Sequence, residues 1–499
     1  MNAPARPQLV VTVPARSVAE ARRAARAARD AGADLAEIRL DLWPPAERER
    51  AGELFPAPLP LVATVRSRAE GGEGPDDPAE RAAVLAAAAR LPFAYLDRER
   101  LRDPMPAEGR EDGPLPVESS HLPAGTTVAA AQAIWTAPSR PGAVRKVVLP
   151  APVGVALTEL VPALHRDPPP PGTSVMTTGP SGPLLRALGA RLGSAWVYAR
   201  LPESATSAPP IEPSQLAVDD LARFFSGPAD APLFALLGRP VAGSPSPRLH
   251  GTWMRRQKVA GIYLPLEIAS ADELAAALRL LPELGFRGAN VTHPWKEAAL
   301  RLAARATPIA RQVGVANCLR FDPDGPLADN TDVAAAEQRL GELRAAGRWD
   351  GETVAVVGSG GAARATVGAA RRLGARAVVY GRNRGAVDRI VRDLGADPGD
   401  PAAPHPARLA VHATTVGRAA SEPLAVPIAS VVAPGGYLLD WVYGAADGEV
   451  ARAAARARAA YEGGDRLLAY QAAESYERWW GLRPPPPDVF AATEGSCAE

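Results

Sequence analysis

The chain has 499 residues, 47% of them apolar, and its 56 basic side chains nearly balance its 55 acidic ones. This length and composition predict at least two domains with large buried cores, and the balanced charge excludes the strongly basic class of nucleic-acid or membrane-surface proteins. The sequence shows neither a signal-type start nor a run of about 18 apolar residues, so we expect a soluble, cytoplasmic protein.

The two cysteines, Cys318 and Cys497, are far apart and lack C-x-x-C spacing. This arrangement argues against a disulfide framework and against a structural zinc site. We therefore expect a protein of a reducing compartment that holds no metal.

Short apolar stretches alternate with alanine-rich helical stretches up to about residue 225. The apolar stretches are LVVTV, LAEIRLDL, LVATVRS, FAYLDRE, LPVESSH, VRKVVLP, TSVMTTG and SAWVYAR. Eight strands separated by helices over this length are typical of a (β/α)8 TIM barrel, in which the loops after the strands form the active site. We predict such a barrel for residues 1–226.

Several of these strands carry polar side chains at a spacing of two residues, which places them on one face of the strand. Glu37 and Arg39 are such a pair, as are Thr64 and Arg66, and Glu99 ends the fourth strand in the same way. One such pair is typical of a salt bridge at a barrel rim. Several together predict a polar site inside the barrel mouth.

Lys146 lies in the middle of the apolar stretch AVRKVVLP. In a desolvated barrel the pKa of a lysine falls towards neutrality, so that its neutral, nucleophilic form becomes available. His121, at the end of the preceding strand, suits proton transfer. The alternatives are a lysine whose ammonium reaches solvent at the barrel rim and a histidine of an ordinary loop.

A new pattern begins after residues 226–232, SGPADAP, which predict a short linker. We expect a two-lobed α/β unit, with a substrate-binding part at 232–349 and a Rossmann-type nucleotide-binding part at 350–482. Its last helix is expected to return to the substrate lobe, and 483–499 to form a tail.

The stretch TVAVVGSGGAARATVG reads as a strand, a glycine turn and a helix. Such a turn lets backbone N–H groups at the helix start approach a pyrophosphate. The next strand ends in Gly-Arg-Asn-Arg, whose cations favour a 2′-phosphate and hence NADP. The predicted cofactor residues are Gly358, Ser359, Gly360, Gly361, Ala362, Asn383 and Arg384.

The motifs GSPSPRLH, GANVTHPWK, GVANCLR, ADNTD, VVGSGGAARA, GRNR, ATTVG, LLDWVY and GGDRLLAYQAAESYERW resemble shikimate dehydrogenase in order and spacing. The resemblance implies a two-lobed α/β dehydrogenase that uses NADPH. Lys296 and Asp332 resemble its catalytic pair, and Thr414 would lie at the cofactor. Substrate contacts would come from Ser244, Ser246, Thr292, Asn317 and Gln471, and from Tyr443, for which a packed aromatic is the alternative.

The chemistry of ketone reduction supports that catalytic pair independently. A ketone that receives hydride becomes an alkoxide and needs a nearby proton donor, which an ammonium positioned by a carboxylate provides. The chain also departs from the family pattern. Gly385 stands at the usual threonine after Asn-Arg, His412 stands at the usual asparagine before Ala-Thr, and the proline and threonine after Tyr443 are absent.

The first half is similar to type I 3-dehydroquinate dehydratase in EIRLD, TVRSRAEGG, YLDRE, SSH, RKVVLP and GPSGPLLR. The resemblance implies a Schiff base on Lys146, proton transfer by His121 and a Glu99 that orients His121. Arg186 would clamp the substrate carboxylate, and Gln215 would belong to a closing loop whose serine could be Ser207. Glu37, Arg39 and Arg66 would complete the pocket.

The combined prediction is a bifunctional enzyme that dehydrates 3-dehydroquinate and then reduces 3-dehydroshikimate to shikimate. We expect small-molecule substrates and no nucleic-acid or membrane partner; the sequence does not indicate an oligomeric state. One alternative keeps the dehydrogenase and makes the barrel a non-catalytic binding or scaffolding module. Another is a different Schiff-base barrel such as an aldolase, which leaves EIRLD and TVRSRAEGG together unexplained.

Overall fold

The structure, a computed structural model, describes residues 6–103, 113–138, 140, 142–206, 208–416, 424, 426–444 and 447–484. It divides into two compact units. The first comprises the residues up to Pro232 together with Ala260–Glu267, and the second comprises the rest. The domain boundaries expected at 226–232 and 349–350 stay predictions. Within the described ranges, no helix is both long enough and apolar enough to cross a membrane.

The first unit contains eight strands of one parallel sheet. They are β1 (Gln8–Val13), β2 (Leu35–Arg39), β3 (Leu61–Thr64), β4 (Tyr95–Glu99), β5 (Leu115–His121), β6 (Val144–Pro150), β7 (Thr173–Thr178) and β8 (Trp196–Ala199). Their order is β7-β6-β5-β4-β3-β2-β1-β8. The Ala195 N–H group donates to the Thr173 carbonyl oxygen at 3.0 Å, so the two end strands nearly meet. The predicted (β/α)8 barrel is confirmed.

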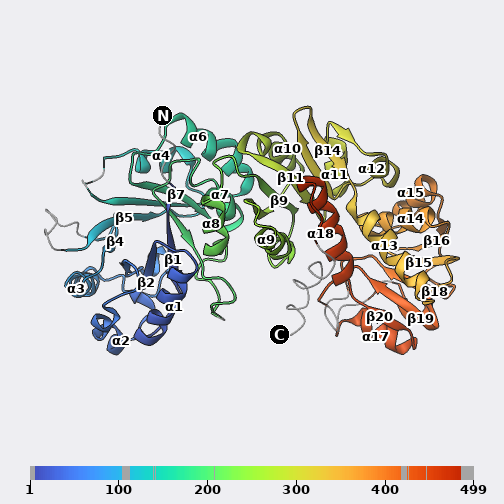
Figure 1. Cartoon of the computed structure of the whole chain (residues 1–499), viewed down its shortest axis with the longest axis horizontal. Helices are drawn as coiled ribbons and strands as arrows, with labels where there is room; N and C mark the ends of the chain where they lie inside the picture. The colour runs from blue at the N-terminus through green and yellow to red at the C-terminus, as the bar shows by residue number, and fades with distance from the viewer. Residues whose placement is uncertain are drawn as a thin grey trace. The chain divides into compact units, whose positions relative to one another are not determined.

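Helices lie outside these strands, as α1 and α8 show in Figure 1. In α1, buried Val18, Ala21, Ala25 and Ala28 follow each other at spacings of three and four residues, which gives the helix one apolar face. The Ser17 side chain caps its start. The helices of this part are α1 (Val18–Asp30), α2 (Pro45–Glu49), α3 (Pro78–Ala88), α4 (Val128–Trp135), α5 (Val153–Val155), α6 (Val161–Arg166), α7 (Gly182–Ala187) and α8 (Val218–Phe225).

Inside the barrel an apolar layer lies below a polar one. The apolar cluster consists of Val10, Leu35, Val62, Val117, Val144, Val148, Met176, Trp196 and Tyr198. On five strands a buried polar residue follows two positions later, on the same face of the strand: Thr12, Glu37, Thr64, Ser119 and Lys146. The apolar layer closes the barrel below, and the polar side chains collect towards the carboxyl ends of the strands.

The part of the chain after Pro232 contains strands of two six-stranded sheets. The first has the order β10-β9-β11-β13-β14-β12 and the second the order β17-β16-β15-β18-β19-β20. The strands of the first are β9 (Leu233–Gly238), β10 (Ile262–Glu267), β11 (Phe286–Val291), β12 (Arg305–Ala306), β13 (Cys318–Asp322) and β14 (Gly325–Asp329). Those of the second are β15 (Thr353–Val357), β16 (Arg376–Tyr380), β17 (Asp397–Pro398), β18 (Ala407–His412), β19 (Val432–Asp440) and β20 (Ala460–Glu462).

The second sheet is parallel, and its strand order reverses after β15. This is the doubly wound order of nucleotide-binding folds, in which ligands bind where the order reverses. The predicted Rossmann-type unit is confirmed. The helices of this part are α9 (Ser246–Arg256), α10 (Ala271–Leu280), α11 (Lys296–Leu302), α12 (Pro308–Val313), α13 (Thr331–Ala345), α14 (Gly361–Arg372), α15 (Arg384–Leu394), α16 (Ile428–Val431), α17 (Glu449–Arg456) and α18 (Asp465–Trp480).

Helix α18 follows the nucleotide-binding sheet in sequence and packs on the other sheet of this unit. Its Trp479 indole donates to the Leu319 carbonyl oxygen at 2.9 Å, and its Ser475 hydroxyl accepts from the Asn290 amide at 2.8 Å. The Trp479 ring also stacks on Phe234 with centroids 4.9 Å apart. The last described helix therefore packs on β9, β11 and β13.

Candidate active sites

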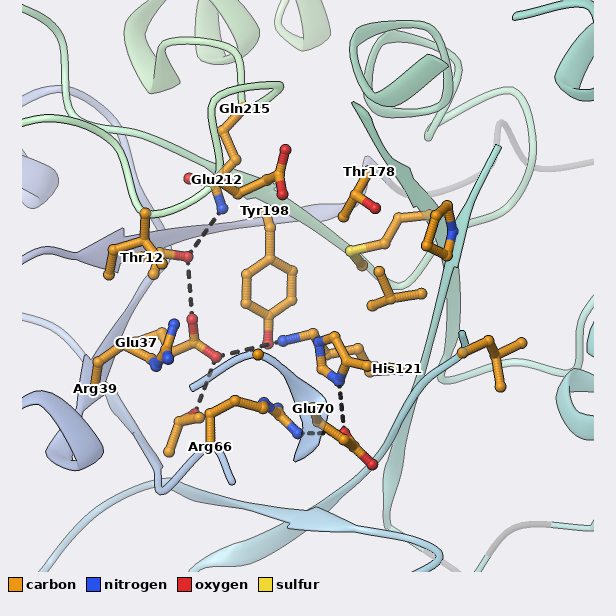
Figure 2. A pocket seen from close by; sticks show the side chains of 18 of the residues that line it. Thr12, Glu37, Arg39, Arg66, Glu70, His121, Thr178, Tyr198, Glu212 and Gln215 are labelled. Atoms are coloured by element: carbon orange, nitrogen blue, oxygen red, sulfur yellow. Dashed lines mark hydrogen bonds and ion pairs between the residues drawn. The ribbon is translucent and has the colours of Figure 1, made fainter. Parts of the chain in front are cut away.

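The barrel mouth holds a cavity of about 660 Å³ lined mostly by strand ends and the loops that follow them. Figure 2 shows Glu37, Arg66, Glu70, His121 and Tyr198 pointing into the same space. Its lining also includes residues that the sequence predicts as functional, namely Arg39, Lys146, Arg186 and Gln215. Strands far apart in sequence thus bring their polar side chains to one place.

Lys146 is almost completely buried, with 5% of its surface exposed. Its Nζ atom lies 3.9 Å from the centre of the Tyr198 ring. The same atom lies 3.4 Å from a Glu37 oxygen and 3.9 Å from an Asp97 oxygen. Burial and the nearby Arg66 guanidinium lower the pKa of Lys146, against the opposing effect of the two carboxylates. The amine is therefore available in its neutral form at lower pH than that of an exposed lysine.

Glu37 is held by hydrogen bonds from two neighbouring strands. The Thr12 and Thr64 hydroxyls each donate to its carboxylate at 3.0 Å. Burial raises the pKa of Glu37, but the nearby Lys146 and Arg39 cations outweigh burial and hold the pKa below its ordinary value. An ionised carboxylate therefore stays beside the buried amine.

His121 lies at the end of β5 and contacts Glu70. Its Nδ1 atom is 2.9 Å from a Glu70 oxygen, and Arg66 donates to that same oxygen at 2.9 Å. Burial lowers the pKa of His121 well below its ordinary value, and Arg66 and Lys146 add to the effect. The imidazole is thus neutral at neutral pH and can accept a proton.

Glu99 does not take the place that the sequence predicts beside His121. Its carboxylate accepts from the Ser67 N–H group at 2.8 Å and from the Ser67 hydroxyl at 2.7 Å, and it pairs with Arg66 at 3.2 Å and Arg81 at 3.4 Å. Through its contacts with Ser67 and Arg66, Glu99 holds the loop after β3 against the end of β4.

Arg186, in α7, is buried and lines the same cavity. It donates to the carbonyl oxygens of Thr177 and Tyr198 at 2.9 and 3.1 Å, and to the Ser214 hydroxyl at 3.2 Å. Burial lowers the pKa of Arg186 to about 10, so the guanidinium stays charged at neutral pH. Next in sequence to Ser214, Gln215 donates to the Thr12 hydroxyl at 3.1 Å. Ser207, named from sequence for the closing loop, is outside the described residues.

The second site is centred on Lys296 and Asp332, which lie in the first turns of α11 and α13. The Lys296 ammonium donates to the Asp332 carboxylate at 2.6 Å. The other Asp332 oxygen accepts from the Asn317 amide at 2.7 Å, and the Asn317 oxygen accepts from the Thr331 N–H group at 2.7 Å. Gln471 in α18 lies 3.5 Å from the same amide. Four predicted residues thus form one network.

The remaining predicted substrate residues lie in loops and at a helix start of the same unit. The Ser244 hydroxyl donates to the Ser246 hydroxyl at 3.3 Å, at the start of α9. Thr292 follows β11 directly, and its methyl group faces Gly238, where a side chain would meet it at 2.2 Å. Tyr443 is partly buried just after β19.

The glycine turn after β15 needs its glycines for two distinct reasons. Gly358 has a φ of +135°, and a side chain there would meet the Ala413 carbonyl oxygen at 2.4 Å. At Gly361 a side chain would meet the Lys296 Cδ atom at 2.9 Å. The turn between them therefore lies against the Lys296 side chain. Gly360 directly precedes α14 and provides no side-chain cap for the N–H groups of the helix start.

The end of β16 presents the predicted basic segment. Asn383 caps α15 by accepting from the Ala386 N–H group at 3.0 Å. Arg382 and Arg384 have exposed side chains, and Arg384 also donates to the Gly399 carbonyl oxygen at 3.3 Å. Ser359 and Ala362 lie in or just after the glycine turn. Two exposed cations therefore flank the strand next to the turn.

Thr414, predicted at the cofactor, is held by His412. The Thr414 hydroxyl lies 2.6 Å from His412 Nε2, and His412 Nδ1 lies 2.7 Å from Asp440. Within the described residues, no cluster of three or more His, Cys, Asp or Glu side chains has an arrangement that could hold a metal ion. Cys318 is buried, with a pKa that burial raises to about 12. Cys497 lies outside the described part of the chain.

Several residues in these sites were not predicted from the sequence, among them Tyr198, which lies in the stretch SAWVYAR. Glu70 was visible only as part of the motif RSRAEGG, and its spacing of four from Arg66 was the available signal. Ser214 directly precedes Gln215, but the serine suggested for the closing loop was Ser207, which extra residues separate from Gln215. His412 appeared only as a departure from a family motif, without its partner Asp440.

Comparison with known protein families matches both halves of the chain. Residues 236–319 match the family described as shikimate dehydrogenase substrate binding domain, and residues 9–109 match type I 3-dehydroquinase. The NADP(+) shikimate dehydrogenase of Acidiphilium cryptum is 40% identical over 261 residues, which cover 51% of this chain and 92% of that relative. The one of Paracoccus denitrificans is 38% identical over 274 residues, covering 52% and 93%.

A solved structure, the shikimate 5-dehydrogenase of Thermus thermophilus in complex with NADP(H) and shikimate, is 29% identical. It covers 53% of this chain and 99% of its own, with a TM-score of 0.48. The identity to the curated relatives extends over nearly their whole length. The chain therefore belongs to the shikimate dehydrogenase family, and it carries a type I 3-dehydroquinase domain ahead of that dehydrogenase.

Proposed function

We propose that the chain is a bifunctional enzyme of the shikimate route to aromatic amino acids. Its barrel removes water from 3-dehydroquinate to give 3-dehydroshikimate, and its second unit reduces that product to shikimate with NADPH. The observation that carries the proposal is the buried Lys146 amine at the base of a polar cavity, in one chain with a Lys296 ammonium paired to Asp332 at 2.6 Å.

The dehydration begins at Lys146. Its neutral amine adds to the substrate ketone, and loss of water gives a protonated iminium, which accepts the electrons of a neighbouring C–H bond. Removal of that proton gives an enamine, and the electrons then expel the β-hydroxyl group as water. A second water molecule hydrolyses the new iminium, releasing the enone and the free amine. One molecule of water is lost overall.

Two features of the cavity suit that cycle. The Tyr198 ring lies against the Lys146 Nζ atom, and an aromatic face attracts a cation such as the iminium nitrogen. His121, neutral in this environment, can take the proton from carbon and return it to the leaving hydroxyl. The register supports their proximity, because Ser119 pairs with Lys146 and His121 follows two residues later on the same face.

Arg186 is proposed to bind the substrate carboxylate. The described residues engage its Nε and Nη1 atoms, and none of them forms a hydrogen bond with Nη2. Arg186 lines the same cavity as Lys146. A carboxylate bound there would hold the substrate ring across the cavity, with its ketone towards the amine.

In the second unit, a bound NADPH would supply the hydride that reduces the substrate ketone. Lys296 donates a proton to the ketone oxygen as negative charge develops on it, and Asp332 holds the ammonium in place at 2.6 Å. Asn317 binds the other Asp332 oxygen and so fixes the carboxylate. The exposed fraction of the Lys296 side chain is 20%, so solvent can return the proton.

The residues around the glycine turn fit an NADP molecule. The turn has no room for side chains at Gly358 and Gly361, and α14 starts with N–H groups that no side chain caps. Such a helix start binds a pyrophosphate. Arg382 and Arg384 stand at the end of the neighbouring strand, where a 2′-phosphate is recognised. The relatives' name, shikimate dehydrogenase (NADP+), supports the same cofactor.

The test uses each active site as the control for the other. Purified protein receives 3-dehydroquinate and NADPH, and the absorbance of the enone and of NADPH are followed in parallel. Lys146→Ala should abolish NADPH consumption from 3-dehydroquinate and leave consumption from 3-dehydroshikimate unchanged. Lys296→Ala should leave enone formation intact and abolish NADPH consumption from either substrate.

Borohydride reduction distinguishes a catalytic dehydratase barrel from a barrel that only binds ligands. With 3-dehydroquinate, borohydride should reduce the iminium to a stable secondary amine on Lys146, detectable as a mass increase on the peptide that contains it. A wild-type barrel that forms no adduct and no enone would refute the dehydratase half. Adduct formation with other carbonyl compounds but not with 3-dehydroquinate would instead indicate a different Schiff-base enzyme.

A further inference from the structure

The serine of the glycine turn lies against the end of the neighbouring strand. β15 and β16 pair in parallel with Val357 opposite Tyr380, so Ser359, two residues further on, lies beside the segment that leaves β16. The space around Gly381 shows the contact directly. A Cβ atom at Gly381 would lie 3.5 Å from both the Cβ and the Oγ atoms of Ser359. The Ser359 side chain therefore borders the end of β16, where Arg382 follows.

The Ser359 hydroxyl is available to a ligand. The residue is partly exposed, and no described residue forms a hydrogen bond with its hydroxyl. Its neighbours in the chain are Gly358 and Gly360, which place no side chain over it. A serine hydroxyl can donate one hydrogen bond. An acceptor that lies between the glycine turn and the end of β16 can therefore receive it.

The end of β16 has little room for the acidic side chain of an NAD-binding fold. Such folds place a carboxylate there, which binds the ribose hydroxyls. In this chain the position is Gly381, and a Cβ atom would meet the Val387 Cγ2 atom at 3.0 Å. The residues that follow include Arg382 and Arg384, both with exposed side chains. This strand end therefore suits a 2′-phosphate better than a free ribose hydroxyl.

The basic segment itself, GRNRGA, contains no hydroxyl group. The Asn383 side chain is used to cap α15, where it accepts from the Ala386 N–H group at 3.0 Å. Gly385 has no side chain, and a Cβ atom there would have its nearest neighbour, the Asn383 Oδ1 atom, at 3.6 Å. A threonine would therefore fit at Gly385. Ser359 offers the hydroxyl that this segment lacks, from the facing turn.

We propose that Ser359 is a specificity-determining residue for NADP, whose hydroxyl donates to the 2′-phosphate held by Arg382 and Arg384 and takes the place of a hydroxyl at Gly385. This inference rests on the proposed dehydrogenase function. A hydrogen bond to a charged phosphate is roughly twice as strong as one between neutral groups. NADPH therefore gains more from Ser359 than NADH does, because the ribose of NADH carries a neutral hydroxyl at that position.

The experiment compares ligands with and without the 2′-phosphate. Dissociation constants of NADPH and NADH are measured from their fluorescence, and that of adenosine 2′,5′-bisphosphate by displacement of NADPH. Ser359→Ala should weaken the binding of NADPH and of the bisphosphate by about tenfold, and that of NADH by less than about twofold. Ser430→Ala is the matched control and should bind all three as wild type does. Ser430 is exposed and lies just before β19, at the opposite edge of the parallel sheet from the glycine turn.

A rescue variant distinguishes a missing hydroxyl from a distorted turn. In the Ser359→Ala background, Gly385→Thr should restore most of the lost NADPH affinity, because it returns a hydroxyl to the other side of the phosphate. Thermal unfolding reports whether each variant folds. Equal weakening of NADPH and NADH in Ser359→Ala would assign the hydroxyl to the pyrophosphate that both share, and unchanged binding would separate it from the cofactor. Either result would overturn the proposal. A wild-type protein that binds neither cofactor would instead refute the dehydrogenase function.

Discussion

His412 Nδ1 lies 2.7 Å from an Asp440 oxygen, and both side chains are completely buried at the ends of the neighbouring strands β18 and β19. The Asp440 carboxylate also accepts from the Val442 N–H group at 2.9 Å. His412 Nε2 contacts the Thr414 hydroxyl at 2.6 Å. This chain of hydrogen bonds fixes the segment whose Ala413 carbonyl oxygen packs against the glycine turn.

Replacing His412 by Ala should therefore weaken the binding of NADPH more than the chemical step. We expect the KM for NADPH to rise about tenfold and kcat with 3-dehydroshikimate to change less, because the Lys296 and Asp332 pair is untouched. The free energy of unfolding should fall by about 1–3 kcal/mol, since Asp440 loses a buried hydrogen bond. His412→Asn, which keeps a polar group towards Asp440, should show smaller changes in both. Equal KM values in the wild type and in His412→Ala would contradict this interpretation.

Asp332→Asn tests the second catalytic pair. The variant keeps the shape of the side chain but removes the charge that holds the Lys296 ammonium, so kcat for NADPH oxidation with 3-dehydroshikimate should fall by about a hundredfold. Asp324→Asn, an exposed aspartate of the turn between β13 and β14, is the matched control and should keep wild-type activity. Dehydration of 3-dehydroquinate should be unchanged in both variants. A fully active Asp332→Asn enzyme would remove Asp332 from the mechanism.

Substitutions at Tyr198 distinguish the effect of its aromatic ring on Schiff-base formation from the effect of its hydroxyl on stability. Its buried hydroxyl has no hydrogen-bond partner among the described residues, and its ring lies under Lys146. Tyr198→Phe should thus keep or raise the melting temperature, because a buried hydroxyl without a partner is destabilising. It should also keep the rate of borohydride trapping, whereas Tyr198→Leu should slow trapping several-fold through loss of the ring face. Equal trapping rates in the two variants would show that the ring does not assist iminium formation.

The raised pKa of Glu70 should make the free energy of unfolding depend on pH. Burial raises the pKa of Glu70 from its ordinary value of 4.5 to about 7 in the folded state. Between these two pH values, Glu70 is therefore protonated in the folded state and ionised in the unfolded chain. Stability from this group is therefore complete below pH 4.5 and is lost as the pH rises to about 7. Glu70→Gln should raise the free energy of unfolding at pH 8 by up to roughly 3 kcal/mol, since one pKa unit corresponds to about 1.4 kcal/mol, and should have little effect at pH 4.

Chemical denaturation of the wild type and of Glu70→Gln at the two pH values provides the measurement. Glu73→Gln, which replaces an exposed glutamate paired with Arg16 at 2.7 Å, is the control. If Glu70→Gln stabilises the protein at pH 8 and also lowers kcat, the Glu70 carboxylate supports activity at a cost in stability. If Glu70→Gln destabilises the protein equally at both pH values, the Glu70 carboxylate contributes through its ion pair with Arg66 and not through a raised pKa.

Much of this architecture was determined locally by the amino-acid sequence. The spacing of two between Val144 and Lys146, or between Leu35 and Glu37, places an apolar and a polar side chain on one strand face, and this local rule predicts both the closed base and the polar mouth of the barrel. The glycine turn at Gly358 and the basic end of β16 could also be predicted from the sequence, because consecutive residues determine a turn, a strand and a helix start.

The tertiary structure alone decided which polar groups meet. Glu70 lies in the turn Arg68–Glu70 after β3, and Glu99 ends β4. Only the path of the loop after β3 brings Glu70 to His121 and Ser67 to Glu99. Asp440 reaches His412 across 28 residues by the same kind of long-range packing. A side-chain contact between strands depends on their stagger and on the loops that cover them. Those are properties of the assembled core, so no single segment of the sequence contains them.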